Sequence, residues 1–327
     1  MKKGFTLSLI LILLLVALPM GTASAATCTP TGFFRDSINL TASLINPSAV
    51  TGTVDATGCN IGVYINTGKV TINGAEIFGA NYFGVVNDGA KVTVKSSNIH
   101  DIGETPLNGT QHGVAVYFVY GSAATGSITG NDIWNYQKGG IVVNGVGTSA
   151  DIKNNTVTGQ GPVSYIAQNG IQVGYGANAM VQGNTVTGNS YTGTSTVSGG
   201  IIVVGGPCPV YDSAYTVGTQ IVNNTVTNND IGVFLTNLDE TCGAPATATN
   251  IKVVNNVISS DGLHNNYGGF GYQAGISDVG NNDKLIHNTI SGPGYDPIAN
   301  PGAYTVPIDA DPPFTNRPKV HANVINP

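Results

Sequence analysis

The sequence predicts an all-β solenoid, in which a single chain winds into a parallel β-helix of about nine coils. Each coil is expected to contain short strands. Two alternating motifs predict it. The first reads IKNNTVTG at 152–159 and returns as VQGNTVTG at 181–188 and IVNNTVTN at 221–228. The second places a glycine before a short apolar strand, as in NGIQV at 169–173 and GGIIV at 199–203. Short repeated strands with glycine and asparagine at the corners, and no helical periodicity, are typical of a solenoid.

The first motif predicts a buried column of asparagines. Aligned on its apolar ends, it occurs at intervals of 22 to 40 residues. Its fourth position is Ala75, Ser97, Asn131, Asn155, Asn184, Asn224, Asn256, Asn288 and Asn323. Stacked strands lie about 4.8 Å apart, so each amide can hydrogen-bond to the next along the axis. Asparagine also tolerates the left-handed backbone of a sharp corner, so we expect these residues to form the corners as well.

The second motif predicts two columns on the outside of one sheet. Two positions after each glycine lie Tyr64, Val86, Ala115, Val142, Gln172, Ile202, Phe234 and Ser277. We expect this column to be an exposed, largely apolar stripe. Two positions before each glycine lie Asn60, Tyr82, Gln111, Lys138, Gln168, Ser198, Asp230 and Gln273. We expect this second column to be a polar, outward-facing stripe.

The N-terminus has the form of a secretion signal. Lys2 and Lys3 precede an apolar run, and a small-x-small cleavage site ends at Ala25, so residues 1–25 are predicted to be removed and the protein to be extracellular. A retained membrane anchor needs a longer apolar run, roughly 20 residues. The letters KKGFTL also resemble the leader of type IV pilin-like proteins, but those usually carry a glutamate where this chain has Leu9.

Charge and cysteine content limit the classes of function. The net charge is −6 before loss of the two leader lysines, and only 9% of residues are charged. Such a surface argues against nucleic acid as a partner, and against a membrane once the leader is gone. The four cysteines predict two disulfides in an oxidising compartment. Cys28–Cys59 would tie an N-terminal cap, residues 26–58, to the first coil, and Cys208–Cys242 would join two neighbouring loops.

The repeats resemble the right-handed parallel β-helix (pectin-lyase-like) superfamily, which includes pectate lyases, polygalacturonases and alginate epimerases. The resemblance covers residues 59–327, within which the Pro-rich segment 293–318 is expected to cover the far end. It implies a secreted protein that binds, and as an enzyme cleaves or epimerises, a polysaccharide along one sheet face between long loops. The aspartate pair and RIK motif of polygalacturonases are absent, and the mature arginines, Arg35 and Arg317, lie outside the repeats, which argues against a pectate-lyase-like arginine base.

Candidate site residues follow from the predicted polar column and the long loops beside it. Removal of a proton next to a uronate carboxylate requires a base and a cation, for which the catalytic candidates are Lys138, His112, Glu104 and Asp101. The substrate-binding candidates are Gln111, Gln168, Asp230, Gln273, Tyr165, Tyr191, His264 and Tyr272. We expect no cofactor or metal site, with Asp309 and Asp311 as the one acidic turn suited to Ca²⁺.

A second class of function is a non-catalytic surface or adhesion rod. Its apolar stripe, represented by Val86, Val142, Ile202 and Phe234, would pack on a partner or on a second copy in a homo-oligomer. Glycan binding by a monomer would favour the polysaccharide-binding protein, whereas a stable oligomer without glycan binding would favour the rod.

Overall fold

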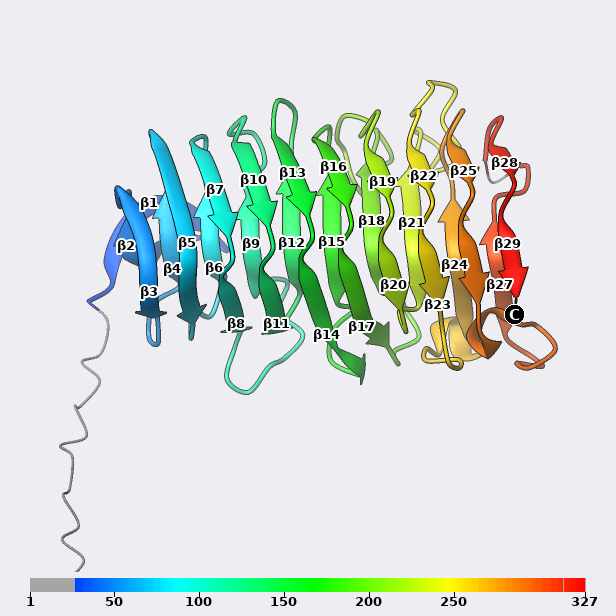
Figure 1. The fold of residues 1–327 in the computed structure, drawn as a ribbon, viewed down its shortest axis with the longest axis horizontal. Coiled ribbons are helices and arrows are strands. Elements are labelled where there is room, and N and C mark those ends of the chain that lie inside the picture. The colour runs from blue at the N-terminus through cyan, green and yellow to red at the C-terminus, as the bar shows by residue number, and fades with distance from the viewer. Residues whose placement is uncertain (1–26, 314, 327) are drawn as a thin grey trace, which may run out of the picture.

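The computed structural model describes residues 27–313 and 315–326, which form a straight rod of stacked coils (Figure 1). The predicted signal, residues 1–25, lies outside the described residues. Successive coils pair in parallel and in register, for example Ile141 with Ile171 and Ile171 with Ile201. The predicted parallel β-helix is therefore confirmed.

One face of the rod, called sheet 1, has 11 strands, and its order along the rod follows the chain. These strands are β1 (Thr29–Arg35), β2 (Ile38–Ile45), β4 (Ile61–Ile65), β6 (Phe83–Asn87), β9 (Val114–Phe118), β12 (Gly139–Asn144), β15 (Asn169–Gly174), β18 (Gly199–Gly205), β21 (Ile231–Asn237), β24 (Tyr272–Asp278) and β27 (Tyr304–Asp309).

Two further rows of strands complete each coil. Sheet 2 contains β7 (Lys91–Lys95), β10 (Thr125–Thr129), β13 (Ser149–Lys153), β16 (Asn178–Gln182), β19 (Gln220–Val222), β22 (Lys252–Val254), β25 (Lys284–Ile286) and β28 (Lys319–His321). Sheet 3 contains β8 (Asn98–Ile102), β11 (Asp132–Tyr136), β14 (Thr156–Val163), β17 (Thr185–Tyr191), β20 (Thr225–Thr227), β23 (Val257–Ser259), β26 (Thr289–Ser291) and β29 (Val324–Asn326). The long β5 (Lys69–Phe78) pairs with both β7 and β8 and so joins the two rows. β3 (Ala49–Asp55) pairs with β5, and two 3-10 turns, η1 (Tyr267–Gly269) and η2 (Pro293–Tyr295), lie in later loops.

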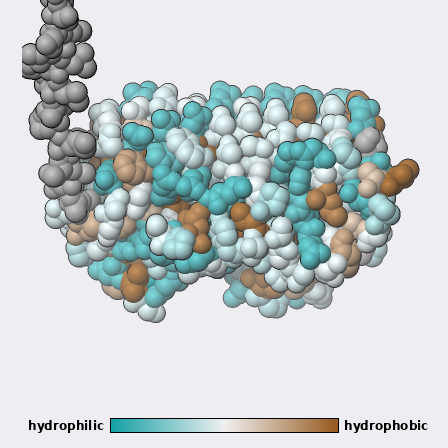
Figure 2. Space-filling model, turned by 90° about the horizontal axis from the view of Figure 1, so that it is seen from below, coloured by the Kyte–Doolittle hydropathy of each residue, from teal (hydrophilic) through white to brown (hydrophobic). Residues whose placement is uncertain are grey.

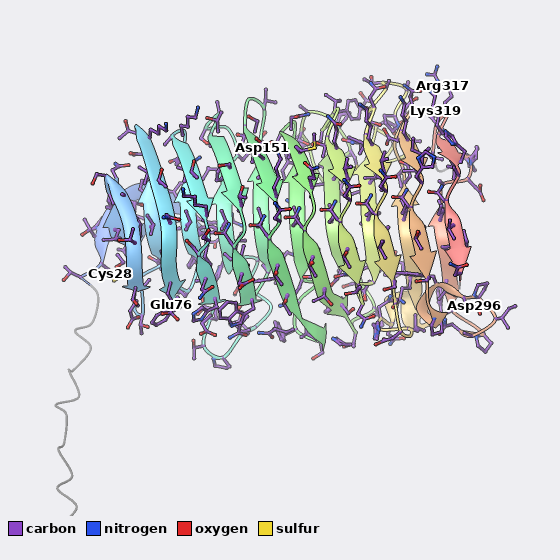
Figure 3. The ribbon with its side chains drawn as sticks, in the orientation of Figure 1. Cys28, Glu76, Asp151, Asp296, Arg317 and Lys319 are labelled. Carbon is purple, nitrogen blue, oxygen red and sulfur yellow. A yellow bond between two sulfur atoms is a disulfide. The ribbon has the colours of Figure 1, made fainter. Side chains whose placement is uncertain are left out.

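The repeated letters TVT are explained by the strand alternation. In β14, β17 and β20 the central Val157, Val186 and Val226 are fully buried in one continuous core, while the threonines on either side face outward. Charged side chains such as Glu76, Asp151 and Lys319 project from the outside of the coils (Figure 3). The repeat therefore follows the alternation of inward-facing and outward-facing side chains along each strand.

The predicted asparagine ladder is confirmed at the bend between sheets 2 and 3. The side-chain amide of Asn155 donates to Asn184 Oδ1 at 2.9 Å, and that of Asn184 donates to Asn224 Oδ1 at 3.0 Å. The same contact joins each pair from Asn131 to Asn323. The ladder residues do not adopt the left-handed backbone, however. That conformation falls on the residue before each of them, such as Asn154 with φ 55°, because the ladder side chain must point inward to reach the next coil.

The two ends of the rod are built differently. β1 runs antiparallel to β2 as a hairpin, and β2 and β3 already pair in parallel with β4 and β5. Parallel stacking thus reaches back into residues 38–55. At the other end, the Pro-rich segment 293–318 contributes η2 and β27, and β27 pairs in parallel with β24.

Both predicted disulfides, Cys28–Cys59 and Cys208–Cys242, are confirmed. Two disulfides indicate an extracellular or otherwise oxidising environment. Within the part of the chain that the structure describes, we find no helix with the length and apolar character to cross a bilayer.

Candidate functional site

A groove lies on the outer face of sheet 1, midway along the rod. It consists of two adjoining hollows of about 380 and 630 Å³. Both are lined by Gln111, Lys138, Gln172, Tyr175 and Tyr211, so the two hollows lie side by side along sheet 1. A concave surface of this size, with aromatic walls and a few polar groups, has the features of a ligand site.

The floor of the groove comes from one column of outward side chains. The strand register aligns Tyr117, Val142, Gln172, Ile202 and Phe234 on β9, β12, β15, β18 and β21. All five line the groove. Because stacked strands lie about 4.8 Å apart, this column presents a regular row to an extended ligand.

The predicted apolar stripe is correct in register at most coils and wrong in two respects. At β9 the column contains Tyr117, because Ala115 occupies the place that glycine has elsewhere. In the adjacent coil this place admits no side chain, since a Cβ on Gly84 would lie 2.5 Å from the carbonyl oxygen of Ala115. The stripe is also not freely exposed: Val86 is fully buried, and Val142 and Ile202 are less than 10% exposed.

One wall of the groove is a row of tyrosines that follow the strands of sheet 1. Tyr120 contacts Tyr175 edge-on at 6.0 Å between ring centroids, and Tyr175 contacts Tyr211 in the same way at 6.3 Å. The opposite wall includes Tyr165 and Tyr191. Tyrosine offers an apolar ring face together with a hydroxyl group, which suits a ligand with both characters.

Two cations reach the groove, and no carboxylate is among the described residues that line it. Arg35 comes from the β1–β2 hairpin, donates from Nη2 to the carbonyl oxygen of Gln111 at 2.9 Å, and lies over the ring of Phe83. Lys138 donates from Nζ to the carbonyl oxygen of Ala167 at 2.7 Å. Burial lowers the pKa of Lys138 to about 8, because removal from water disfavours the charged ammonium. Neither cation forms an ion pair in the described part of the chain.

Three predicted substrate-binding residues are loop clamps instead. Gln168, Asp230 and Gln273 are fully buried, so their expected outward orientation is wrong. Gln168 accepts from the Gln160 amide, Asp230 from the Tyr191 and Ser198 amides, and Gln273 from the His264 amide. They turn inward because the loops entering sheet 1 carry backbone groups that need buried partners.

The four catalytic candidates do not form one cluster. His112 Nε2 lies 2.7 Å from Glu104 Oε1, and the His112 ring stacks on Tyr82, so this pair is packed together. Asp101 instead contacts His100 at 2.7 Å and Asn135. Lys138 extends toward the next coil, where its Nζ donates to the carbonyl oxygen of Ala167. Of the four, Lys138 alone lines the groove.

The remaining candidates divide in the same way. Gln111, Tyr165 and Tyr191 line the groove, whereas His264 and Tyr272 lie further along the rod. His264 contacts Asp261 at 2.7 Å, and the Tyr272 hydroxyl donates to Asp309 at 2.8 Å. Asp309, one of the two carboxylates suggested for Ca²⁺, is thus engaged by a tyrosine.

Sequence reasoning missed several groove residues. Arg35 lies outside the repeats, and its contact with Gln111 spans 76 residues. Tyr120, Tyr175 and Tyr211 were missed because they follow the glycine strands instead of belonging to them. The repeated tyrosine-glycine after β9 and β15, at Tyr120 and Tyr175, was the signal available in the sequence.

The stacked parallel strands and the buried amide ladder define the protein as a parallel β-helix. Residues 46–212, just over half of the chain, match the family of the right handed beta helix region, and the protein belongs to this family. No curated protein and no solved structure gave a match.

Proposed function

We propose that the protein is secreted and binds an acidic polysaccharide in the groove on sheet 1. The observation that carries this proposal is the combination of Arg35 and Lys138, neither of them ion-paired, with tyrosines and amides in a groove whose described lining residues include no carboxylate. A guanidinium recognises a carboxylate through paired hydrogen bonds, and an ammonium adds a point charge. The aromatic walls and the amides of Gln111, Asn144 and Gln172 suit the sugar rings and hydroxyls.

The cations are concentrated at one end of the groove. Both line the smaller hollow, together with Phe83 and Tyr117. The larger hollow extends over Ile202 and Phe234, where the lining is uncharged apart from Lys138. An acidic sugar would therefore bind near Lys138, and further sugars of the chain would lie along the floor toward β21. On the face seen in Figure 2, hydrophobic residues are scattered among hydrophilic ones.

The lowered pKa of Lys138 favours β-elimination as a second candidate function. At a pKa of about 8, part of the lysine is neutral near pH 7 and can accept the proton next to a uronate carboxylate. Arg35 would neutralise that carboxylate, the bond to the leaving sugar oxygen would break to give an unsaturated uronate, and the leaving oxygen would take a proton from water. Hydrolysis is less well supported, because it requires two carboxylates facing the bond and the described lining contains none.

Binding can be tested by isothermal titration of the purified protein with polygalacturonate, alginate and neutral dextran. We expect the acidic chains to bind and dextran to bind at least about tenfold more weakly. Lys138→Ala and Arg35→Ala should each reduce the affinity for the acidic chain about tenfold. Lys153→Ala is the matched control, because Lys153 lies on sheet 2 and pairs with Asp151. Equal affinity for dextran and polygalacturonate, or unchanged affinity in both cation variants, would contradict the proposal.

Elimination is tested separately by ultraviolet absorbance of an unsaturated product. The wild type should generate it faster as the pH rises toward 8, because more Lys138 becomes neutral. Binding of acidic chains without any such product would retain the binding function and exclude the reaction.

A further inference from the structure

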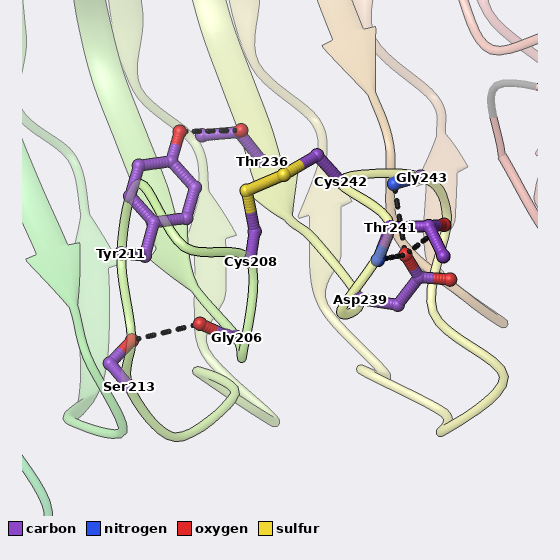
Figure 4. The surroundings of a disulfide bond; sticks show 9 residues. All are labelled: Gly206, Cys208, Tyr211, Ser213, Thr236, Asp239, Thr241, Cys242 and Gly243. Carbon is purple, nitrogen blue, oxygen red and sulfur yellow. Dashed lines mark hydrogen bonds between the residues drawn. A yellow bond between two sulfur atoms is a disulfide. The ribbon is translucent and has the colours of Figure 1, made fainter.

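Part of the tyrosine wall of the groove is carried by an insertion that is not part of the coil. Residues 206–216 leave sheet 1 after β18 and fold back on themselves before β19. The amide of Gly206 donates to the carbonyl oxygen of Ala214, and that of Ser213 donates to Gly206, both at 3.1 Å. Figure 4 shows this loop beside the Cys208–Cys242 disulfide.

The insertion delivers Tyr211 to the ligand site. Tyr211 lines both hollows and packs edge-on against Tyr175. Its hydroxyl lies 3.0 Å from Thr236 Oγ1 on β21 (Figure 4). The ring therefore stands against the floor of the groove although it comes from a loop.

The disulfide holds the turn that carries Tyr211. The amides of Tyr211 and Asp212 both donate to the carbonyl oxygen of Cys208 at 2.8 Å. Cys208 is fully buried and is bonded to Cys242 in the loop of the next coil. The base of the insertion is held independently of the disulfide. The Thr216 amide donates to Asn237 Oδ1, and the side-chain amide of Asn237 donates to the carbonyl oxygen of Thr216. Apart from the disulfide, the turn is joined to the next coil by the Cys208 amide, which donates to the carbonyl oxygen of Leu238 at 3.4 Å, and by the Tyr211 hydroxyl at Thr236. Loss of the disulfide would thus loosen the turn and leave the coil stack in place.

We propose that the Cys208–Cys242 disulfide positions Tyr211 in the groove, so that reduction of this bond opens the wall and weakens polysaccharide binding. The inference rests on the proposed function, and it adds control of the same site by a thiol reductant. Tyr211 would contact the ligand, and the two cysteines would act through it as positioning residues.

The structure also indicates how reduction would proceed. Residue Cys242 is exposed, whereas Cys208 is buried, so we expect a thiolate of a dithiol reductant to attack the sulfur of Cys242. The bond between the two protein sulfurs breaks, and Cys208 leaves as a thiolate that takes up a proton. The second thiol of the reductant then closes its own disulfide and releases Cys242 as a thiol. Two electrons and two protons pass from the dithiol to the protein.

The test compares oxidised and dithiothreitol-treated protein in two measurements. Titration with polygalacturonate should show about tenfold weaker binding after reduction. Hydrogen exchange should show faster exchange at the amides of Tyr211, Asp212 and Ser213, with little change in the asparagine ladder. The double variant Cys208→Ser/Cys242→Ser should match the reduced wild type and should not respond further to dithiothreitol.

Two variants separate the role of the tyrosine from that of the loop. Tyr211→Ala with the disulfide intact should lose about as much affinity as reduction does. Thr241→Ala, next to Cys242 but outside the groove lining, should bind normally.

Unchanged affinity and unchanged exchange after reduction would overturn the inference. It would also fail if dithiothreitol weakened the double variant as much as the wild type, because Cys28–Cys59 would then be responsible. If the oxidised wild type binds no acidic chain, the proposed function fails, while the exchange measurement still decides whether the disulfide positions Tyr211.

Discussion

Two of the three bends of each coil differ in how strictly they repeat. Between sheets 2 and 3, an asparagine at the same place bonds to its equivalent in the next coil, from Asn131 to Asn323. Between sheet 3 and sheet 1, the loops differ in length, and each is held by a different buried residue, such as Gln168 or Asp230. The first bend is uniform from Asn131 to Asn323. At the second, one coil-to-coil bond joins Asn189 to Asn229, and the other clamps differ from coil to coil.

The difference shows where the chain is free to vary. At the uniform bend each side chain is the hydrogen-bond partner of the next, so a change in one coil leaves buried groups unpaired in its neighbours. At the variable bend each clamp accepts from the amides of one loop, as Gln168 does from Gln160 and Asp230 does from Tyr191 and Ser198. Loops that carry Gln111, Tyr165 and Tyr191 can therefore differ without disturbing the stack, and these residues line the groove.

The largest effect is expected from Asn184→Ala in the ladder. This change removes the acceptor of the Asn155 backbone and side-chain amides and the donor to the carbonyl oxygen of Ile152. Because several buried groups lose partners, the free energy of unfolding should fall by about 3 kcal/mol. Denaturant unfolding measures it. Asn98→Ala, on the exposed side of β8, should change stability by no more than about 0.5 kcal/mol. Equal losses in the two variants would remove the distinction between the ladder and the surface.

A smaller, pH-dependent effect is expected at the clamp Asp230. Burial raises its pKa to about 7, against about 3.9 in the unfolded chain. The folded state therefore holds a proton between pH 4 and 7 that the unfolded state has lost, so the contribution of Asp230 to the free energy of unfolding is greatest below pH 4 and falls as the pH rises to 7. Asp230→Asn should accept the same two amides without this titration. It should remove this slope between pH 4 and 7. A parallel pH profile in the variant would show that Asp230 is not the group responsible.

The smallest effect on stability is expected from Gln168→Ala at the variable bend. Gln168 accepts from the Gln160 amide and donates to the carbonyl oxygen of Tyr136. Its loss should cost about 1 kcal/mol of unfolding free energy, but hydrogen exchange at Gln160 should become much faster, because the loop has lost its clamp. Affinity for polygalacturonate should fall about threefold, since Tyr165 lies on that loop. Gln182→Ala on sheet 2 is the control. Neither change is expected to alter hydrogen exchange elsewhere in the stack.

The fold was predictable because its determinants repeat along the chain. The inward Val157, Val186 and Val226 occupy equivalent positions, and so do the ladder asparagines from Asn131 to Asn323, so alignment of the copies reveals them. Alignment failed at β9, where the glycine of HGVAV, Gly113, lies two residues before the equivalent position, which is Ala115. The error displaced the outward column by two residues and hid Tyr117.

The candidate site was less predictable because its residues come from segments that do not repeat. Lys138, Gln111, Tyr165 and Tyr191 were found because they lie in or next to the motif. Gln168 was misassigned because the sequence does not distinguish a polar side chain that faces solvent from one that satisfies a buried loop.

The sequence by itself determined the coil, the ladder and both disulfides, because each depends on a spacing that equals one turn of the stack. The tertiary structure decided the groove. Arg35 meets Gln111 across 76 residues, and Tyr211 reaches Thr236 through a disulfide-held insertion. These contacts arise from how the cap and loops fold over sheet 1, and no repeated spacing encodes them.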